Sequence, residues 1–410
     1  MDIRKSANRY EAWLRKQLNG DIDEHDLAEK HDKMAKDAFQ FLRATYWRWA
    51  VSIDKACPDL KRGPQVLSVG DIHIENFGTW RDAEGRLVWG VNDFDEAARM
   101  PYVHDIVRLA TSAVLAGATG ITRQAICEAI LGGYQQGLKD PRPIVLDREY
   151  EELRKVAVVS ESERKDFWKK FDPARIEAER KKREKKGDDK RQKVRAAHAM
   201  RDRYRKALEA GRPDRGTVFD YYERTAGTGS LGRRRYFGVG AWRGDLVVRE
   251  AKAIVPSGWA LAHGNSRRLR CAEIATGRYR SPDPYYALVG SVLLRRLSPN
   301  DFKIEAVPKG GKAKEKDKKE ETHKLVDRKA LVDAAVLEAM GQDLASIHRG
   351  TPRRRKAILA DLEGRDAGWL HAAAKSAQKQ VEADFKAWSA AYGKKGKRKK
   401  GRKSGKRAAG

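Results

Sequence analysis

The sequence predicts an α+β fold in which helix-rich and strand-rich stretches follow one another along the chain. Apolar residues recur at helical spacing within residues 26–53 and 331–349. Short apolar strands separated by glycines and turns fill residues 221–253. With 410 residues and 40% hydrophobic content, the chain is long enough for one large or two modest cores.

Shifts in composition predict six successive parts of the chain. They are a helical entry with an acid-rich strand region (1–140), a charged helical insertion (141–215), a small β-rich part (216–308), a charged linker (309–324), a helical part (325–392) and a disordered basic tail (393–410). Residues 1–60 are predicted to be helical, and Pro58, Gly63 and Pro64 break the chain before a strand at 65–69.

Two clusters of polar residues flank an apolar strand at 86–91. The clusters are Asp71, His73, Glu75 and Asn76, then Asn92, Asp93, Asp95 and Glu96. A turn at 82–85 makes the region hairpin-like, which brings Asn76 and Asp93 to one end of a small sheet. Carboxylates there lose hydration and repel one another unless a cation or donors satisfy them. Carboxylate and amide oxygens suit Mg²⁺.

The spacing of these residues matches the catalytic machinery of kinases. Asp71 and Asn76 lie five positions apart, as in the kinase catalytic loop, and Asp93-Phe94-Asp95 falls where kinases carry Asp-Phe-Gly. Asp71 would accept the proton of an attacking hydroxyl, while Asn76 and Asp93 would hold Mg²⁺. Asp95 would assist with a second metal ion.

Helices are predicted at 104–118 and 122–138, and Asp105 in the first turn of the former is placed to interact with the helix dipole. The lysine-, arginine- and glutamate-rich stretch 173–211 predicts a solvent-exposed helix. Gly227, Gly229 and Gly232, with Ser230 between them, form a GxGxxG pattern followed by a β-hairpin. A dinucleotide fold would need a helix there, so the context favours a kinase-type glycine loop over phosphates.

The segments GDIHIENFG (70–78), NDFDEA (92–97) and HDIVRLATS (104–112) resemble the bacterial domain-of-unknown-function 2252 family. The resemblance covers about residues 30–388. That family is similar to the aminoglycoside and choline kinase branch of the protein-kinase-like fold. The resemblance implies that Asp105 braces the catalytic loop and that His73 orients it.

The resemblance also implies a cation that binds the nucleotide phosphates. Alignment on the family's Lys-Glu-Ala places Arg249 there, with Lys252 as the alternative. Strand alternation puts these two side chains on opposite faces, so only one can point at a nucleotide. A helix predicted at 265–276 carries Glu273 as the candidate partner of that cation. Two strand segments within 285–297 would lead to the connection between lobes.

The motif order is reversed relative to kinases, because the catalytic-loop motif precedes the glycine-loop motif. The residues before Asp71 look helical, and the helix ending Leu344-Ala-Ser-Ile-His348 resembles the one that precedes the kinase catalytic loop. We therefore expect a two-lobed kinase-like fold that is circularly permuted. Residues 1–140 and 325–392 would form the large lobe, and 216–308 the nucleotide-binding lobe.

The leading functional hypothesis is an ATP- and Mg²⁺-dependent phosphotransferase that acts on a hydroxyl of a small molecule. One alternative is a metal-dependent hydrolase that uses Asp71, His73, Glu75 and Asp93. Another is a non-catalytic nucleotide- or RNA-binding module that uses the basic tail and the 173–211 stretch. Transfer of a nucleotidyl group is a further possibility.

The charge and the cysteine content indicate which partners and which cellular compartment to expect. The net charge is +29, and the tail 393–410 holds ten Lys and Arg and no acid, which leaves +19 for the rest. The tail predicts a solvated segment, with non-specific contact to nucleic acid or acidic surfaces as one role. The three cysteines share no metal or disulfide spacing, which favours a reducing, cytoplasmic compartment. No stretch approaches the length of a membrane span.

Overall fold

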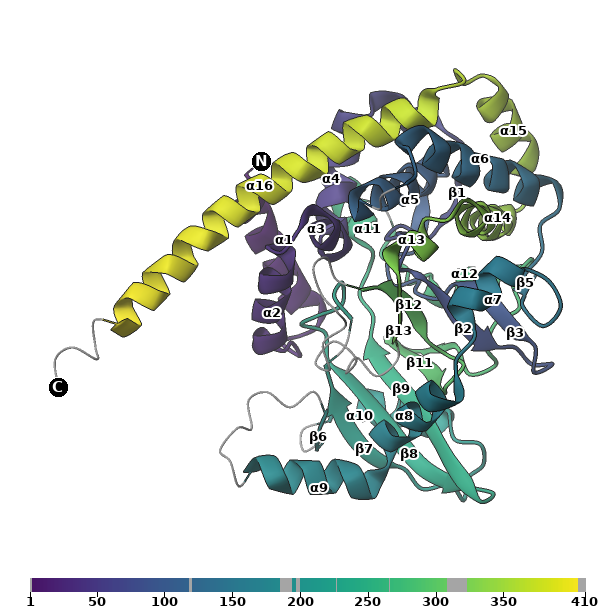
Figure 1. Cartoon of the computed structure of the whole chain (residues 1–410). Helices are drawn as coiled ribbons and strands as arrows, with labels where there is room; N and C mark the ends of the chain where they lie inside the picture. Colours follow the sequence, from purple (N-terminus) through teal and green to yellow (C-terminus); the bar gives the residue numbers. More distant parts are fainter. Residues whose placement is uncertain are drawn as a thin grey trace.

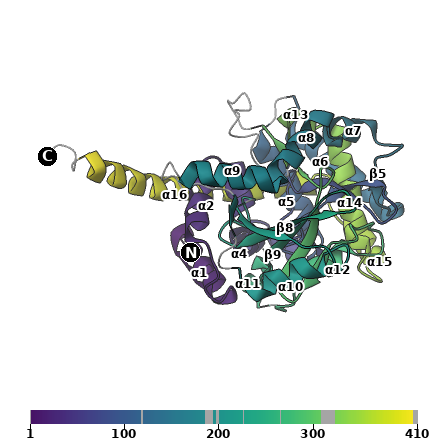
Figure 2. The same cartoon turned by 90° about the horizontal axis from the view of Figure 1, so that it is seen from below.

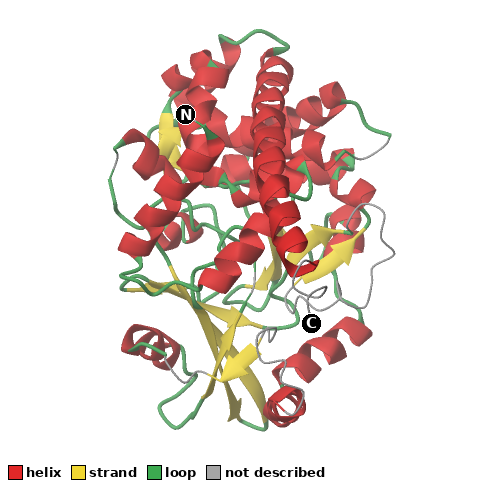
Figure 3. Cartoon of the chain, turned by 90° about the vertical axis from the view of Figure 1, so that its left-hand side faces the viewer, coloured by secondary structure: helices red, strands yellow, loops and turns green. Residues whose placement is uncertain are grey.

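The computed structural model describes residues 2–117, 120–184, 194–196, 200–225, 227–264, 266–307 and 323–404. The fold is α+β, as predicted, and most helices gather on one side of the strands (Figures 1 and 3). The α-helices are α1 (Ile3–Gln17), α2 (Glu24–Met34), α3 (Ala38–Ala44), α4 (Tyr46–Ala56), α5 (Val103–Ala116), α6 (Arg123–Lys139), α7 (Glu151–Ala157), α8 (Glu161–Phe171), α9 (Pro173–Glu184), α10 (Asp202–Ala210), α11 (Gly258–His263), α12 (Cys271–Ala275), α13 (Arg328–Leu331), α14 (Ala334–Arg349), α15 (Arg355–Glu363) and α16 (Trp369–Ser404).

The described strands form three sheets. The strands are β1 (Gln65–Ser68), β2 (Phe77–Arg81), β3 (Leu87–Val91), β4 (Ala98–Pro101), β5 (Ile144–Val145), β6 (Val194–Ala196), β7 (Asp220–Arg224), β8 (Arg235–Trp242), β9 (Asp245–Ala253), β10 (Ala287–Val289), β11 (Val292–Leu297), β12 (Lys303–Ala306) and β13 (His323–Val326). Their orders are β1-β4, β10-β11-β9-β8-β7-β6 and β13-β12-β2-β3-β5.

The six-stranded sheet is antiparallel throughout and is covered on both faces. Successive residues of β8 point to opposite faces, as strand geometry requires. Tyr236 therefore packs on Tyr204 of α10, with ring centroids 4.7 Å apart, while Phe237 packs on Phe171 of α8 at 5.2 Å. The 141–215 insertion thus contributes buried aromatic anchors, whereas its lysine-, arginine- and glutamate-rich composition predicted only an exposed helix at 173–211.

The hairpin of β2 and β3 forms the centre of the five-stranded sheet, and its register pairs Phe77 with Val91. Only β12 and β13 pair in parallel in this sheet. The hairpin therefore delivers the residues just before Phe77 and just after Val91 to the same end of the sheet, as the sequence predicts. Strand β1 lies apart from this sheet and pairs with β4, which follows the second polar cluster.

Helices α6 and α14 approach each other closely because glycines lie at their crossing. A Cβ on Gly133 would lie 1.9 Å from the carbonyl oxygen of Glu338, and one on Gly341 would lie 2.2 Å from that of Ile130. This contact brings α14, from the end of the chain, against β1 and β3 near its start. Helix α16 packs on α4 and α5 and then projects beyond the body (Figures 1 and 2).

Two expectations differ from the structure. Helix α12 begins only at Cys271, because the arginine-rich residues 266–270 follow Gly264, which ends α11 in the left-handed conformation (φ +67°). Helix α16 continues to Ser404 instead of ending before the basic tail, since lysine and arginine favour helices. The predicted linker 309–324 lies outside the described residues except for its last two. Among the described helices, none combines the length and apolar character needed to cross a membrane.

Candidate active site

The loop that carries Asp71 is fixed by hydrogen bonds to its backbone. Asp105 of α5 accepts bonds from the N–H groups of Val69 (2.7 Å) and Gly70 (2.9 Å). The same carboxylate contacts Nε2 of His348 at the end of α14 (3.1 Å). Gly70 has φ +81°, and a Cβ there would lie 2.5 Å from the carbonyl oxygen of Glu96, so this turn requires glycine. Asp105 thus holds the backbone that leads into Asp71.

Asp71 is held by an arginine and faces a pocket. Arg108, which is buried in α5, pairs with Oδ1 of Asp71 and also donates to the carbonyl oxygen of Leu42 (2.8 Å). Burial raises the pKa of Asp71, and the Arg108 guanidinium opposes that rise. Since Arg108 takes Oδ1, Oδ2 is the oxygen that faces the turn at Gly229, where a Cβ would lie 3.5 Å away.

Asn76 has one amide oxygen that no described residue satisfies. Its Nδ2 donates to the carbonyl oxygens of Asp71 (3.0 Å) and Asp93 (3.2 Å), which fixes the orientation of the amide. Oδ1 is then left buried without a hydrogen-bond partner among the described residues. A buried acceptor in this state is costly unless a cation or donor reaches it. The position therefore fits a ligand of a hard metal ion.

Two acidic residues follow β3 and meet lysines from distant strands. Lys303 Nζ lies 2.6 Å from Oδ2 of Asp93, and Lys252 Nζ lies 3.6 Å from its Oδ1. Lys252 Nζ also lies 2.6 Å from Oδ1 of Asp95. Burial raises the pKa of Asp93, but Lys252 and Lys303 outweigh it and hold that pKa well below its usual range. Asp93 is thus ionised, with a lysine ammonium group beside each of its oxygens.

The glycine-rich segment forms the turn between β7 and β8 and lies over these residues. Gly227 (φ +76°) and Gly232 (φ +94°) adopt left-handed conformations that side chains disfavour. The carbonyl oxygen of Gly229 accepts a hydrogen bond from Lys30 Nζ (2.7 Å), and Ser230 Oγ accepts one from Arg235 (2.8 Å). The turn therefore joins the N-terminal helices to the strands that carry the acidic residues.

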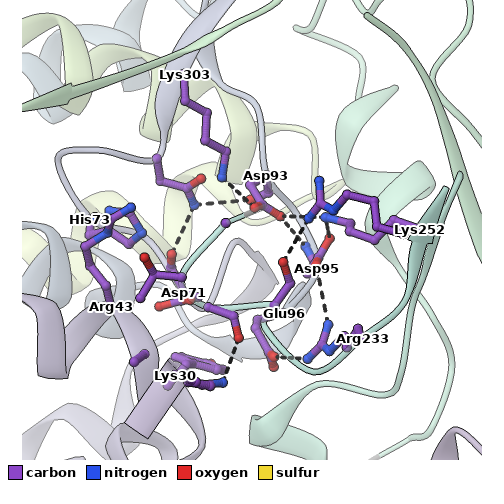
Figure 4. A pocket seen from close by; sticks show the side chains of 18 of the residues that line it. Lys30, Arg43, Asp71, His73, Asp93, Asp95, Glu96, Arg233, Lys252 and Lys303 are labelled. Atoms are coloured by element: carbon purple, nitrogen blue, oxygen red, sulfur yellow. Dashed lines mark hydrogen bonds and ion pairs between the residues drawn. The ribbon is translucent and has the colours of Figure 1, made fainter. Parts of the chain in front are cut away.

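The side chains of Asp71, Asn76, Asp93 and Lys252 and the glycine turn line one pocket. Among the described residues, its lining includes eight Lys and Arg and five Asp and Glu, so the lining is predominantly cationic. Figure 4 shows the labelled cations surrounding the acidic residues, with Lys303, Lys252, Arg233 and Lys30 on different sides. This excess of positive charge suits an anionic ligand such as a phosphate ester.

The structure brings most of the predicted site residues together at the pocket, but three predicted nucleotide-binding residues, Gly232, Arg249 and Glu273, do not line it. Lys252 lines the pocket, whereas Arg249 on the other face of β9 stacks on Tyr285, 3.7 Å from the ring centroid. Glu273 does not pair with Lys252 but with Arg270 (2.8 Å), because the helix predicted around it is reduced to α12. The position on β9 that faces the pocket is thus that of Lys252 rather than that of Arg249.

His73 lines the pocket beside the loop of Asp71. Burial, reinforced by Arg43, holds the pKa of His73 well below its usual range, so the ring is neutral. Its Nδ1 accepts a hydrogen bond from the backbone N–H of Glu75 (3.2 Å). Among the described residues, the one cluster with three potential ligand atoms of His, Cys, Asp or Glu within 4.8 Å is Asp23, His25 and Asp26, outside this pocket. A hydrolase that uses Asp71, His73 and Asp93 stays a prediction.

Several pocket or contact residues escaped the sequence analysis. They are Lys30, Arg108, Arg233 and Lys303. Arg108 could have been recognised, because it is the lone charged residue inside the apolar helix segment 106–116. The others come from α2, β12 and the turn before β8, and nothing in their local sequence predicts a common site.

The comparisons with known proteins give one match. A family model described as "Uncharacterized protein conserved in bacteria (DUF2252)" matches residues 23–271, which is more than half of the chain. No curated protein and no solved structure matches. The matched segment runs from the start of α2 to the first residue of α12, so it holds both polar clusters, the glycine turn and Lys252. The chain therefore belongs to the DUF2252 family of uncharacterized proteins conserved in bacteria.

Proposed function

We propose that this protein is a Mg²⁺-dependent phosphotransferase that moves the terminal phosphoryl group of ATP to a hydroxyl group of a small molecule. The observation that carries the proposal is the amide of Asn76. Its orientation is fixed by two backbone carbonyls, one of them that of Asp93, while its Oδ1 is buried without a partner among the described residues. Asn76 and Asp93 together would hold Mg²⁺, which usually keeps one or two protein oxygens plus substrate phosphates.

Each further group has a matching role. Bound Mg²⁺ would neutralise charge on the phosphates of ATP. Lys252, and the backbone of the glycine turn, would bind phosphate oxygens from the opposite side. Oδ2 of Asp71 would accept the proton of the attacking hydroxyl, since Oδ1 is engaged by Arg108. Positioning and fixed charges of this kind supply most of the catalysis in phosphoryl transfer.

The arrangement of elements supports a kinase-like, circularly permuted fold as part of the proposal. The glycine turn joins the first two of three consecutive antiparallel strands, and the third carries Lys252, as in the kinase small lobe. His348, at the end of α14, contacts Asp105 at the loop of Asp71. In the proposed permuted fold, α14 would correspond to the helix that precedes the catalytic loop of a kinase.

The test uses γ-labelled ATP, Mg²⁺ and a small-molecule extract of bacterial cells. We expect wild-type protein to transfer label to one or more extract compounds. Asp71→Asn should abolish transfer and keep ATP binding, because it removes the proton acceptor and leaves Asn76, Asp93 and Lys252 in place. Asp59→Asn, in the segment before β1 and outside the pocket, is the matched control and should transfer label like wild type. ATP that is neither bound nor consumed by wild-type protein would contradict the proposal.

A further inference from the structure

One lysine of the pocket lies on the far side of Asp71 from the proposed metal site. Lys30 comes from α2 and is only 3% exposed. In Figure 4, Asp71 lies between Lys30 and Lys303, and Lys303 contacts Asp93, one of the proposed metal ligands. When the hydroxyl group of an acceptor lies beside Asp71, the remaining atoms of that acceptor would therefore lie in the part of the pocket that contains Lys30.

Lys30 differs from the other cations of the pocket in its partners. Lys252 pairs with Asp95, Lys303 with Asp93, and Arg233 with Glu96 at 3.1 Å. No described carboxylate forms an ion pair with Lys30. Its Nζ donates one hydrogen bond, to the carbonyl oxygen of Gly229 (2.7 Å). An ammonium group has three hydrogens, so two donors remain for a ligand.

A buried ammonium group without a counter-ion is in an unfavourable state. Burial lowers the pKa of Lys30 to about 8, and Arg233 adds to this effect, while Glu96, Asp71 and Glu11 act against it without pairing with the lysine. An oxyanion beside Lys30 would supply the missing counter-charge. The cationic excess of the whole lining points the same way.

The position of Lys30 decides which reactant would bring that anion. Lys30 holds Gly229, and the turn at Gly229 lies against Oδ2 of Asp71, the proposed proton acceptor. In the proposed function, Mg²⁺ held by Asn76 and Asp93 would bind the ATP phosphates together with Lys252 and the backbone of the glycine turn, and Lys30 has no part in this set. The charge at Lys30 is thus left for the second substrate.

We infer that the acceptor is a small hydroxyl compound that carries an oxyanion, and that Lys30 binds this oxyanion next to Asp71. The inference rests on the proposed function, since it names the acceptor class of the same site. It excludes cationic acceptors such as choline, which the resemblance to choline kinases would otherwise imply. Lys30 is then a specificity-determining residue whose side chain also holds the glycine turn.

The experiment measures thermal melting of the full chain saturated with Mg²⁺ and a non-hydrolysable ATP analogue. Four probes are then added separately, namely glycerol 3-phosphate, glycerate, glycerol and choline. The first two distinguish phosphate from carboxylate, and the last two are neutral and cationic controls. The proteins are wild type, Lys30→Met, Lys30→Arg and Lys36→Met. Lys36 is an exposed lysine just after α2, so Lys36→Met removes the same charge outside the pocket.

We expect an additional, saturable melting shift with at least one anionic probe and none with glycerol or choline. Lys30→Met should weaken the apparent affinity for that probe at least tenfold, while Lys30→Arg and Lys36→Met retain it. Lys30→Arg, which can still donate to the carbonyl oxygen of Gly229, should keep the shift caused by the nucleotide analogue. The inference is overturned by equal anion shifts in wild type and Lys30→Met, or by no anion shift in wild type.

The outcomes also separate this inference from the proposed function. If wild type shows no shift with Mg²⁺ and the analogue, the phosphotransferase proposal fails, whatever the anionic probes do. If the nucleotide shift is present and the anionic probes have no effect, the proposed function stands and the acceptor class is wrong. The melting temperature without ligand reports on folding, so a misfolded Lys30→Met is detected. Lys30→Gln, which removes the charge but keeps a donor for the carbonyl oxygen of Gly229, then replaces it and should lose the anion shift.

Discussion

Lys252 Nζ lies 2.6 Å from Oδ1 of Asp95, and this contact joins β9 to the acidic segment after β3. Residues more than 150 positions apart in the sequence thus share one pocket. Both side chains are nearly buried, so each charge depends on the other or on a ligand. The contact also decides which face of β9 is turned towards the pocket, because Arg249 lies on the opposite face.

Replacement of Lys252 by methionine should remove the melting shift caused by ATP and Mg²⁺. Breaking a buried pair typically costs about 3–5 kcal/mol of folding stability, so the melting temperature without ligand should also fall. Arg249→Met removes a cation of the same strand that stacks on Tyr285 outside the pocket. It should keep the ATP shift. An ATP shift that is lost in Arg249→Met and kept in Lys252→Met would contradict the assignment.

Replacement of Asn76 by leucine should weaken Mg²⁺ binding at a fixed ATP concentration by at least tenfold, because it deletes the unpaired Oδ1. Asn92→Leu is a matched control, since Asn92 also has a buried Oδ1 without a described partner but does not line the site pocket. Loss of a hydrogen-bonded amide should destabilise both variants by roughly 1–3 kcal/mol. A Mg²⁺ titration followed by melting separates the two, and equal Mg²⁺ affinities would remove Asn76 from the metal site.

His104 should make the protein sensitive to acid. Burial lowers the pKa of His104 to about 4 from an ordinary value of 6.5. Between these values the unfolded chain binds a proton that the folded protein does not, so stability falls as pH drops from 6.5 towards 4. The loss amounts to at most about 3 kcal/mol. His104→Phe keeps a ring against Trp259 and should flatten the unfolding free energy over this pH range. An unchanged pH profile would show that other groups cause the acid sensitivity.

The crossing of α6 and α14 provides a test of packing with adjacent glycines. Gly133→Ala would place a Cβ 1.9 Å from a backbone oxygen of α14, so α14 must shift, and we expect a loss of about 1–3 kcal/mol. Gly132→Ala meets no atom within 4 Å and should stabilise the helix by roughly 0.5–1 kcal/mol. Urea unfolding of both variants measures the difference. Equal effects would mean that the two helices do not cross at Gly133.

The local sequence was sufficient to predict those parts of the site that a single hairpin brings together. Asn76 and Asp93 flank β2 and β3, so hairpin geometry alone predicts that they meet, and the register of Phe77 with Val91 agrees. The strands around the glycine turn were predictable for the same reason, since glycine positions and strand alternation are local signals. The α+β class also followed from local patterns.

Contacts between distant segments were not predictable in this way. Lys30 and Lys303 lie in charged stretches that resemble any solvated surface, and only the packing of α2 and β12 brings them to the pocket. To choose between Arg249 and Lys252, one must know which face of β9 is turned towards the pocket. This depends on what covers each face of the sheet. Glu273 was misassigned because the arginines before it do not extend α12 as expected.

The most direct test of the account is the melting temperature of purified wild type and Asp93→Asn with ATP, Mg²⁺ or both. At about 100 times its dissociation constant, a ligand should add roughly 2.7 kcal/mol, which is readily seen as a melting shift. The account predicts a shift that needs both ATP and Mg²⁺ and is lost in Asp93→Asn. No shift with ATP and Mg²⁺, or an equal shift in Asp93→Asn, would contradict it.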